Sequence, residues 1–522
     1  MERGNGAGLP LPGAYRSRDL VTRTEPLIPD WVQPGTDPFY ARELDRIRWA
    51  QPSATGPSVK LVLVMLVGLA LGRAAPSQAQ LRGLELLVDS VMAHGMAEEH
   101  IPGAAFVLVH AGRTVLEKGY GFANLDTKQK VSPRTTIFPI ASISKLMTAT
   151  AVMQLVDRGQ VELNTDVNQY LHSVKVPATY PQPITLTHLL THTGGLDEIP
   201  GRQVASTTEQ RPLGEFLFDR LVRVHPPGEI TSYSTYGIAL AGVLIEDVSG
   251  LQLEPYLERN VWNPLSMHRT YINVPDSMAG DVAAGYAYED GRVEEVPHEI
   301  YQTTPASSIM STAADMARFM IAHLQDGRLD DVRILSDAAA QGMHRQQATV
   351  HPLLPGWTLG FQVSDVNGLR IIEHGGDIGG FSSLLVLLPD QNTGFFVVHH
   401  REGANLRFDL KRRLLDRYFP DRRPVRTPVP RFQATPQLRR FAGTYRASTF
   451  CHSCNEPGNV QDFEVTVNND GTITVWGQKW VEVSPLYFVG VDGRGRIGFK
   501  QDSRGRIVAM SGGSWRVVER IR

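Results

Sequence analysis

A stretch rich in proline and arginine, PDRRPVRTPVPRFQATPQ at residues 420–437, interrupts the chain late in its sequence. It holds few large apolar side chains, and proline lacks the N–H group that helices and sheets use, so the stretch is typical of a linker. The whole chain has 522 residues, which is too long for one ordinary hydrophobic core. We therefore expect a larger folded unit at residues 81–419 and a smaller one at residues 438–522.

The smaller unit consists of short runs in which apolar and polar residues alternate, namely FEVTVN, TITVWG, YFVGV, RIGFK, IVAMS and SWRVVER. Alternation with a period of two is typical of strands that bury one face. The runs are separated by NNDG, DGRG and DSRG, and these residues favour tight hairpin turns. The pattern predicts a small antiparallel β-barrel.

The larger unit mixes helical and strand periods. The expected helices cover residues 81–99, 142–158, 312–325 and 403–418. The expected strands cover residues 104–110, 114–123, 358–365, 369–375, 382–388 and 394–400. Between residues 160 and 300 the pattern indicates helices with many loops.

An apolar run near the start, LVLVMLVGLALG at residues 61–72, follows Lys60 and precedes the small-residue sequence Ser77-Gln78-Ala79. This combination is typical of a secretory signal peptide, here residues 59–79. The run is also shorter than the roughly 20 residues that cross a bilayer. No cysteine follows the cleavage site, so a lipoprotein is not expected.

The preceding residues, 1–58, are polar and show no regular period, so we expect them to be unstructured, with translation starting near Val59 or Met65. The alternative is an uncleaved anchor at residues 61–72. The first interpretation predicts a periplasmic or secreted protein that contacts the membrane only during export, and the second predicts a membrane-anchored one.

Composition excludes some classes of partner and cofactor. The formal net charge is -2, so nothing indicates nucleic-acid binding. His188 and His192 have the spacing of a zinc pair but lack the usual glutamate, so no metal or organic cofactor is expected. Two cysteines cannot form a disulfide framework; for Cys451 and Cys454 we favour a local disulfide, while a free pair or half of a metal site remain open.

The segment FPIASISKLMTAT places Ser142 three residues before Lys145 at the head of an apolar helix. Residues with this spacing lie on one helical face. A serine hydroxyl becomes a good nucleophile when a base removes its proton. Burial lowers the pKa of lysine and so allows it to accept that proton. The pair therefore indicates nucleophilic catalysis, although the same four residues can also be a capping serine and an ordinary packed lysine.

Further motifs follow in order, namely ITLTHLLTHTGGL (184–196), PPGEITSYSTYGIALAGVLIEDVSG (226–250), NPLSMHRTYI (263–272), PASSIMSTAADMARF (305–319) and HGGDIGGFSSLLVLLPD (374–390). With FPIASISK they resemble the serine β-lactamase and penicillin-binding-protein superfamily, specifically its class C β-lactamase-like branch of peptidases and esterases. The resemblance implies an α/β fold with an antiparallel sheet flanked by helices, a mainly helical part, and Ser142 between them. It also implies a lipocalin-like C-terminal barrel, whose opening strand fits FAGTY (441–445).

The resemblance assigns roles to individual residues. Ser142 matches the nucleophile, Lys145 its partner, and Tyr233 the tyrosine that acts as base and then as proton donor. We expect the positive charge of Lys145 to lower the pKa of Tyr233. The backbone N–H groups of Ser142 and Asp377 match the oxyanion hole, and the side chain of Asp377 either points away or attracts a substrate amine.

Two positions depart from the family pattern. Thr235 replaces an asparagine and offers only a hydroxyl group, so recognition of a substrate amide is weakened. His374-Gly375-Gly376 replaces Lys-Thr-Gly, so the fixed positive anchor for a β-lactam carboxylate is weaker. We expect His374 to line the site, where it either binds a substrate carboxylate or relays protons. Gly376 and its neighbouring glycines permit close backbone approach to a ligand.

The resemblance implies hydrolysis of a small peptide, amide or ester through an acyl-enzyme on Ser142, with Lys145 and Tyr233 sharing the proton transfers. We favour a peptidase acting on D-amino-acid-containing or cell-wall-type peptides. A carboxylesterase and a β-lactamase are the alternatives, and a scaffold that has lost its chemistry is the non-enzymatic one. Oligomers are compatible with the sequence.

Overall fold

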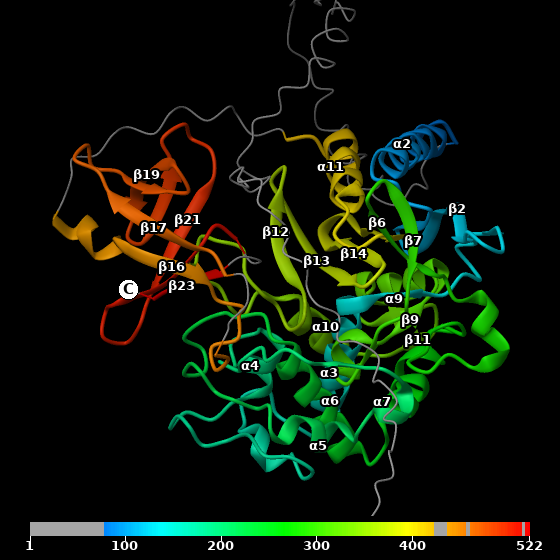
Figure 1. Ribbon diagram of the computed structural model, residues 1–522, viewed down its shortest axis with the longest axis horizontal. Helices are drawn as coiled ribbons and strands as arrows, with labels where there is room; N and C mark the ends of the chain where they lie inside the picture. The colour runs from blue at the N-terminus through cyan, green and yellow to red at the C-terminus, as the bar shows by residue number, and fades with distance from the viewer. Residues whose placement is uncertain (1–77, 422–435, 456–459, 514–516, 522) are drawn as a thin grey trace, which may run out of the picture. The chain divides into compact units, whose positions relative to one another are not determined.

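The computed structural model describes residues 78–421, 436–455, 460–513 and 517–521 (Figure 1). Residues 1–58 and most of the predicted signal peptide lie outside the described residues, as does most of the predicted linker. The first helix, α2 (Gln78–Glu98), begins just before the expected mature start.

A seven-stranded antiparallel sheet forms the centre of the larger unit, in the order β12-β13-β14-β15-β1-β2-β3. Its strands are β1 (Gly103–His110), β2 (Arg113–Asn124), β3 (Gln129–Lys130), β12 (Gln362–Val366), β13 (Leu369–Ile378), β14 (Phe381–Leu388) and β15 (Thr393–His400). Phe106 of β1 pairs with Val397 of β15. An early hairpin thus completes a sheet whose other long strands come from the end of the unit.

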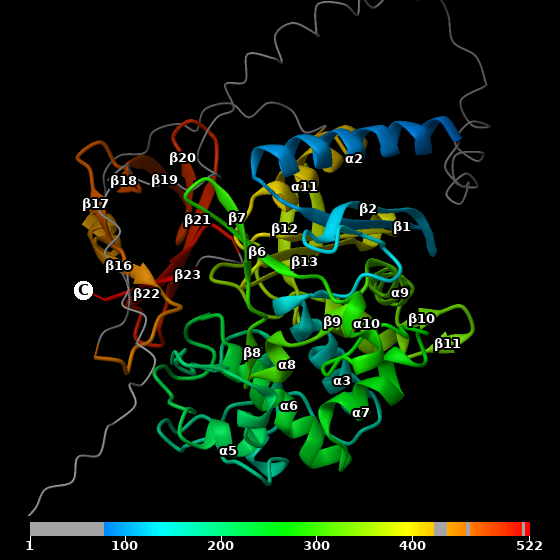
Figure 2. The ribbon, with the colours of Figure 1, turned by 45° about the vertical axis from the view of Figure 1, so that its right-hand side comes forward.

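Helices cover both faces of this sheet (Figure 2). Phe106 packs on one face with α2 and with α11 (Leu406–Tyr418). Val107, its neighbour on β1, packs on the other face with Phe319 of α9 (Ala313–Leu324). Successive side chains of a strand point to opposite faces, so both faces of β1 are apolar and both are buried.

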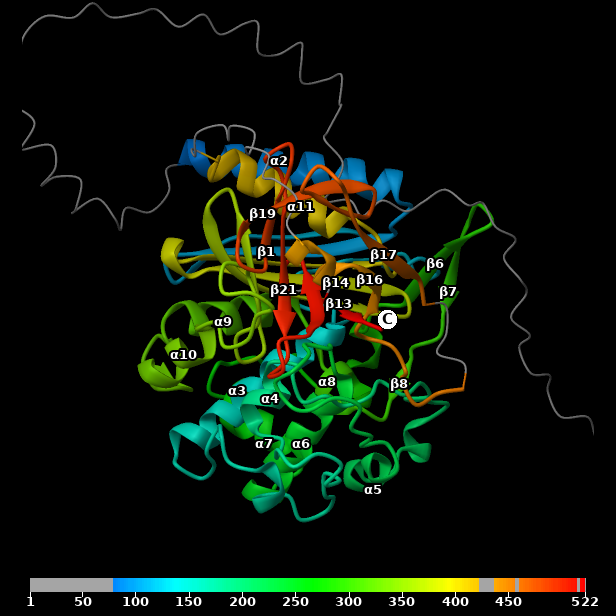
Figure 3. The same ribbon diagram turned by 90° about the vertical axis from the view of Figure 1, so that its left-hand side faces the viewer.

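A helical part lies on the α9 side of the sheet (Figure 3). Its helices are α3 (Ser144–Asp157), α4 (Leu186–Leu190), α5 (Leu213–Phe218), α6 (Thr235–Ser249), α7 (Leu253–Leu257), α8 (Thr304–Ser307) and α10 (Asp337–His344). Short helical turns are η2 (Ala141–Ile143), η3 (Val167–Gln169), η4 (Thr207–Glu209), η5 (Glu258–Trp262), η6 (Asp276–Asp281) and η7 (Pro389–Gln391). Short strand pairs are β4 (Phe138–Pro139) with β9 (Met310–Ser311), β5 (Gln203–Val204) with β8 (Ile300–Tyr301), β6 (Gly285–Glu289) with β7 (Arg292–Val296), and β10 (Arg328–Leu329) with β11 (Val332–Arg333).

Helix α6 is apolar and packed inside this part. A Cβ atom on Gly242 would lie 2.2 Å from Pro305 Cγ, so glycine permits α6 and α8 to approach closely. Among the described residues, a membrane-spanning length and hydropathy is reached by no single helix; it is reached only by α6 together with Leu253–Trp262, across a 75° bend.

The C-terminal unit is a closed antiparallel barrel of β16 (Gly443–Ala447), β17 (Asp462–Val467), β18 (Ile473–Val475), β19 (Gln478–Ser484), β20 (Tyr487–Gly490), β21 (Arg496–Gln501), β22 (Ile507–Ser511) and β23 (Val517–Arg520). The short helix η8 (Pro436–Phe441) precedes it and begins inside the predicted linker. Phe441, Trp480 and Phe499 fill its core. The predicted barrel is confirmed, although β19 was not among the expected runs.

Barrel residues contact the loop that leads to α6. Ser232 Oγ donates to the carbonyl of Ser448 at 2.8 Å, and Lys500 Nζ donates to the carbonyl of Gly228 at 2.6 Å. Ile230 packs in a buried apolar cluster with Val517. The barrel therefore shares polar and apolar contacts with the segment just before Tyr233.

Candidate active site

Ser142 lies on a tight turn rather than on regular α-helix. The turn η2 precedes α3, so the helix begins two residues later than the sequence predicts. Ala141 has a φ of 49°, in the left-handed region that costs a residue with a Cβ atom roughly 1–2 kcal/mol. Such strain concentrates at functional sites, and here it falls on the residue before the candidate nucleophile.

The turn is held against the sheet and against β9. Ser383 Oγ of β14 donates to the carbonyl of Ile140 at 3.0 Å, and the Ile140 N–H donates to the carbonyl of Ile309 at 3.0 Å. A Cβ atom on Gly376 of β13 would lie 2.5 Å from the Ile140 carbonyl oxygen and 3.1 Å from Ala141 Cβ. Glycine at position 376 therefore permits β13 to pack against the turn that carries Ser142.

Lys145 reaches Ser142 from the first turn of α3. Its Nζ atom lies 3.1 Å from Ser142 Oγ and donates to the carbonyl of Ala306 at 2.9 Å. Only 1% of the lysine is exposed. Burial lowers the pKa of Lys145 to about 7, against the opposing effect of Glu198. A large share of this amine is thus neutral near pH 7 and able to accept the Ser142 proton.

Tyr233 completes the group. It hydrogen-bonds with Ser142, and Lys145 Nζ lies 4.9 Å from the centre of its ring. Burial raises the pKa of Tyr233 above its ordinary value. The expectation that the charge of Lys145 lowers this pKa is therefore wrong: with a largely neutral lysine and a buried ring, the phenol stays protonated. Tyr233 is therefore placed to donate a proton, and the neutral amine of Lys145 is placed to accept one.

Glu198 connects Thr235 to this group. Its Oε1 atom accepts from the N–H groups of Thr235 at 2.5 Å and Tyr236 at 3.3 Å, where a carboxylate complements the positive end of α6. Its Oε2 atom pairs with Arg202 at 3.2 Å. Because Glu198 also acts on Lys145 electrostatically, it tunes the base without touching Ser142.

Two histidines pack around Tyr233 as neutral rings. His374 Nδ1 donates to the Gly375 carbonyl at 2.7 Å, which leaves a lone pair on Nε2. His192 Nδ1 accepts from the Ser234 N–H at 3.1 Å, which leaves a proton on Nε2. Neither Nε2 atom has a hydrogen-bond partner within the described residues.

The surroundings of these histidines keep them uncharged. Burial and the nearby lysine lower the pKa of His374 to about 3, and the same two causes lower the pKa of His192 well below its usual value. The ring of Trp357 lies 4.4 Å from that of His192 and 6.0 Å from that of His374. The group thus offers one neutral donor and one neutral acceptor beside Tyr233.

The side chain of Asp377 points toward α11. It pairs with Arg407 at 2.7 Å and accepts from Ser382 Oγ at 2.6 Å. Burial opposes its ionisation, but Arg407 outweighs burial and lowers its pKa. Of the two expected orientations, the structure has the one that points away, so Asp377 can serve the site through its backbone and is not placed to attract a substrate amine.

Comparison with known proteins identifies the family. The family model described as Beta-lactamase matches residues 88–418. The chain belongs to the β-lactamase family. The match runs from the middle of α2 to the end of α11, the part of the chain that carries every residue of the candidate site.

Curated relatives agree with the family assignment. Protein flp of Staphylococcus aureus (strain N315) is 27% identical over 337 residues, 63% of this chain and 64% of the relative, so the chain spans less than two thirds of that protein. Penicillin-binding protein 4 of Amycolatopsis lactamdurans is 30% identical over 67% of this chain and 94% of its own length.

Two solved structures share the fold. The octameric penicillin-binding protein homologue from Pyrococcus abyssi has a TM-score of 0.58 at 22% identity, covering 83% of this chain and 99% of its own. The beta-lactamase/D-alanine carboxypeptidase from Pseudomonas syringae has a TM-score of 0.55 at 20% identity, covering 65% of this chain and 100% of its own.

Sequence reasoning missed several contributors to this β-lactamase-family site, namely His192, Glu198, Arg202, Ala306 and Trp357. Only His192 had been considered, as half of a zinc pair with His188. His188 Nδ1 instead lies within hydrogen-bonding distance of the backbone N–H of Thr185 as part of a helix cap. The signal for Glu198 was a carboxylate shortly after the HTGGL motif, but nothing in the sequence indicates that it caps α6.

Proposed function

We propose that the protein is a serine hydrolase that cleaves an amide or ester through an acyl-enzyme on Ser142. The observation that carries the proposal is the buried Lys145 amine, 3.1 Å from Ser142 Oγ, with its pKa lowered to about 7. Membership of the β-lactamase family supports it.

In the first step, neutral Lys145 takes the Ser142 proton as Oγ attacks the substrate carbonyl. The C–O bond to the enzyme forms and the carbonyl oxygen becomes an oxyanion, which the backbone N–H groups of Ser142 and Asp377 are proposed to stabilise. The oxyanion then collapses and the bond to the leaving group breaks as Tyr233 donates a proton to that group, and Lys145 returns a proton to Tyr233. A water molecule next gives a proton to Lys145 and attacks the acyl carbon. The ester bond to Ser142 Oγ breaks, Oγ regains a proton, and the acid is released.

For the substrate we favour D-amino-acid-containing or cell-wall-type peptides, in line with the names of the relatives, penicillin-binding protein 4 and beta-lactamase/D-alanine carboxypeptidase. A carboxylesterase is the second candidate. It is favoured by the neutral state of His374, whose pKa of about 3 leaves no cation there to hold a carboxylate. The proposed export of the protein rests on the sequence at residues 59–79 alone.

Intact-mass detection of covalent adducts tests the proposal. The purified chain and its Ser142→Ala variant are incubated with a fluorophosphonate, a penicillin, a nitrophenyl ester and a D-alanyl peptide. We expect one adduct per wild-type chain and none on the variant. Labelling that persists in Ser142→Ala contradicts the assignment, and no adduct with any probe favours the scaffold. The order of turnover rates separates peptidase, esterase and β-lactamase.

A further inference from the structure

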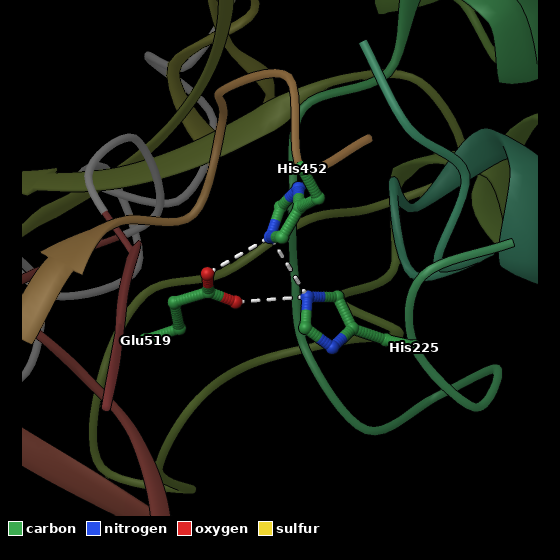
Figure 4. A group of neighbouring side chains, drawn as sticks. All are labelled: His225, His452 and Glu519. Atoms are coloured by element: carbon green, nitrogen blue, oxygen red, sulfur yellow. Dashed lines mark hydrogen bonds and ion pairs between the residues drawn. The ribbon is translucent and has the colours of Figure 1, made fainter. Parts of the chain in front are cut away.

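Three side chains that the acyl-enzyme chemistry does not use converge where the barrel meets the hydrolase unit (Figure 4). His225 precedes the loop that leads to Tyr233, His452 lies between the two cysteines, and Glu519 lies on β23. One nitrogen from each histidine and one oxygen from the carboxylate all lie within 4.8 Å of one another.

The separations match the edges of a metal coordination shell. His225 Nε2 lies 2.8 Å from Glu519 Oε2, His452 Nε2 lies 2.8 Å from Glu519 Oε1, and the two Nε2 atoms lie 3.2 Å apart. Zinc bonds to nitrogen and oxygen of about 2.0–2.1 Å in a tetrahedral shell place neighbouring ligand atoms about 3.3 Å apart. A small movement of each side chain would therefore bring the three ligand atoms to the separations of a tetrahedral zinc site.

The carboxylate of Glu519 is buried and faces both histidine rings. Glu519 is 4% exposed, and His225 Nε2 and His452 Nε2 each lie 2.8 Å from one of its two oxygens. A buried carboxylate is costly unless a proton donor or a cation pairs with it. A metal ion between the three side chains would pair with the carboxylate and both rings at once.

Asp197 holds His452 in the orientation that a metal ligand requires. Its Oδ1 atom lies 3.3 Å from His452 Nδ1 and accepts from the His452 backbone N–H at 2.8 Å. A carboxylate behind the distal ring nitrogen is the usual support of a metal-bound histidine. The Cys451–Cys454 disulfide closes the short loop that carries His452, so the favoured disulfide and a histidine suitable for metal binding occur together.

We propose that His225, His452 and Glu519 bind a divalent transition-metal ion, with zinc as the chemically matched example. Two imidazoles and a carboxylate form a three-ligand set that zinc accepts, and a water molecule completes the shell. The ion joins the hydrolase loop through His225 to the barrel through His452 and Glu519. Its role is to fasten the two units together beside the segment that carries Tyr233.

The competing interpretation is an ion-pair network without metal. Burial would lower the pKa of His452, but Asp197 and Glu519 raise it to about 9, so a proton can take the place of the ion. The two interpretations differ in what they predict for zinc. Metal binding releases protons, so the test is made at pH 8.

The first experiment is equilibrium dialysis of the chelator-treated full chain against zinc, followed by elemental analysis. We expect about one zinc per wild-type chain, and affinity at least tenfold lower in Glu519→Gln and in His225→Asn. The control removes an exposed histidine–glutamate pair, His94 and Glu98, whose Nε2 and Oε2 atoms lie 3.3 Å apart. The variants His94→Asn and Glu98→Gln should bind zinc as the wild type does.

The second experiment uses only the wild-type chain, so it does not depend on a variant folding. Diethyl pyrocarbonate modifies accessible histidines, and peptide mass spectrometry reports which ones react with and without zinc. We expect zinc to protect His225 and His452 while His94 reacts equally in both samples. Absence of stoichiometric zinc, or protection that does not include these two histidines, overturns the proposal in favour of the ion-pair network.

Discussion

Lys145 is buried beside Ser142, and this placement decides which of the three side chains can act as base. A cation without water around it is unstable, so the amine loses its proton far below its ordinary pKa. The same burial keeps the phenol of Tyr233 protonated. Burial therefore favours the neutral form of both groups. The neutral amine of Lys145 can accept a proton, and the neutral phenol of Tyr233 can donate one.

The pH dependence of catalysis follows from this pKa. Below about pH 7 most Lys145 carries a proton and cannot accept another, so kcat/KM should rise with pH to a plateau above about 7. Because Glu198 raises this pKa, Glu198→Gln should move the rising limb to lower pH. Kinetic profiles with a nitrophenyl ester measure the shift.

Glu254 provides the matched control, since it is also a carboxylate that accepts two backbone N–H groups. Glu254→Gln should leave the limb in place. If the rising part of the kcat/KM–pH profile does not move in Glu198→Gln, Lys145 is not the group whose titration controls activity.

Gly376 and Gly375 are adjacent on β13 and differ sharply in the room beside them. A Cβ atom on Gly376 would clash with Ile140 and Ser383 at 2.5 Å, whereas one on Gly375 would meet only the Ser383 carbonyl oxygen at 3.7 Å. We expect Gly376→Ala to displace the turn that carries Ser142 and to lower kcat/KM by about 10²-fold. Gly375→Ala should change it little. Equal losses in the two variants, measured by steady-state kinetics, would contradict this account.

At the scale of elements, the periodic pattern of apolar residues predicted most helices and strands of the larger unit. It did not predict the turns at which these elements begin. The helix expected at residues 142–158 begins as the turn η2, because Ile140 is hydrogen-bonded to Ser383 of β14 and to Ile309, while Gly376 of β13 packs against it. The helix expected at residues 312–325 corresponds to α9, capped by Thr312. A local pattern reports periodicity, whereas a strained turn depends on contacts made by distant residues.

Strand β13 and helix α11 are joined through Asp377 and Arg407. Arg407 is buried, while 38% of the Asp377 side chain is exposed. Asp377→Asn keeps an acceptor but loses the charge, so we expect a loss of roughly 1–2 kcal/mol in the free energy of unfolding. Activity should be unchanged, because only the backbone N–H of Asp377 is proposed to take part in the chemistry.

Urea unfolding and steady-state kinetics measure the two quantities. Asp409 pairs with Arg412 and Arg413 on the surface of α11, so Asp409→Asn is the control and should cost less than about 0.5 kcal/mol. A tenfold loss of kcat in Asp377→Asn at unchanged stability would assign the side chain a direct role in the reaction.

At the scale of the whole molecule, the barrel contributes to the packing of the loop before Tyr233. Ile230 is 4% exposed and lies in one apolar cluster with Val350, Ala509 and Val517. We expect Ile230→Ala to reduce the free energy of unfolding by roughly 2–4 kcal/mol, as measured by urea denaturation. Val293→Ala, at an exposed site on β7, should cost less than about 0.5 kcal/mol. Equal effects would mean that the barrel does not stabilise this loop.

The amino-acid sequence by itself determined the antiparallel sheet with its flanking helices, the C-terminal barrel and the family, and it predicted the trio Ser142, Lys145 and Tyr233. These features depend on the local spacing of apolar residues, on turn-forming residues and on the order of motifs, all of which can be identified from the sequence alone. The tertiary structure decided how β1 meets β15, how Glu198 reaches Lys145, and how His225 meets His452 and Glu519. It also decided the protonation of Lys145 and Tyr233, because desolvation depends on everything that packs around a group, and no local stretch of sequence contains that information.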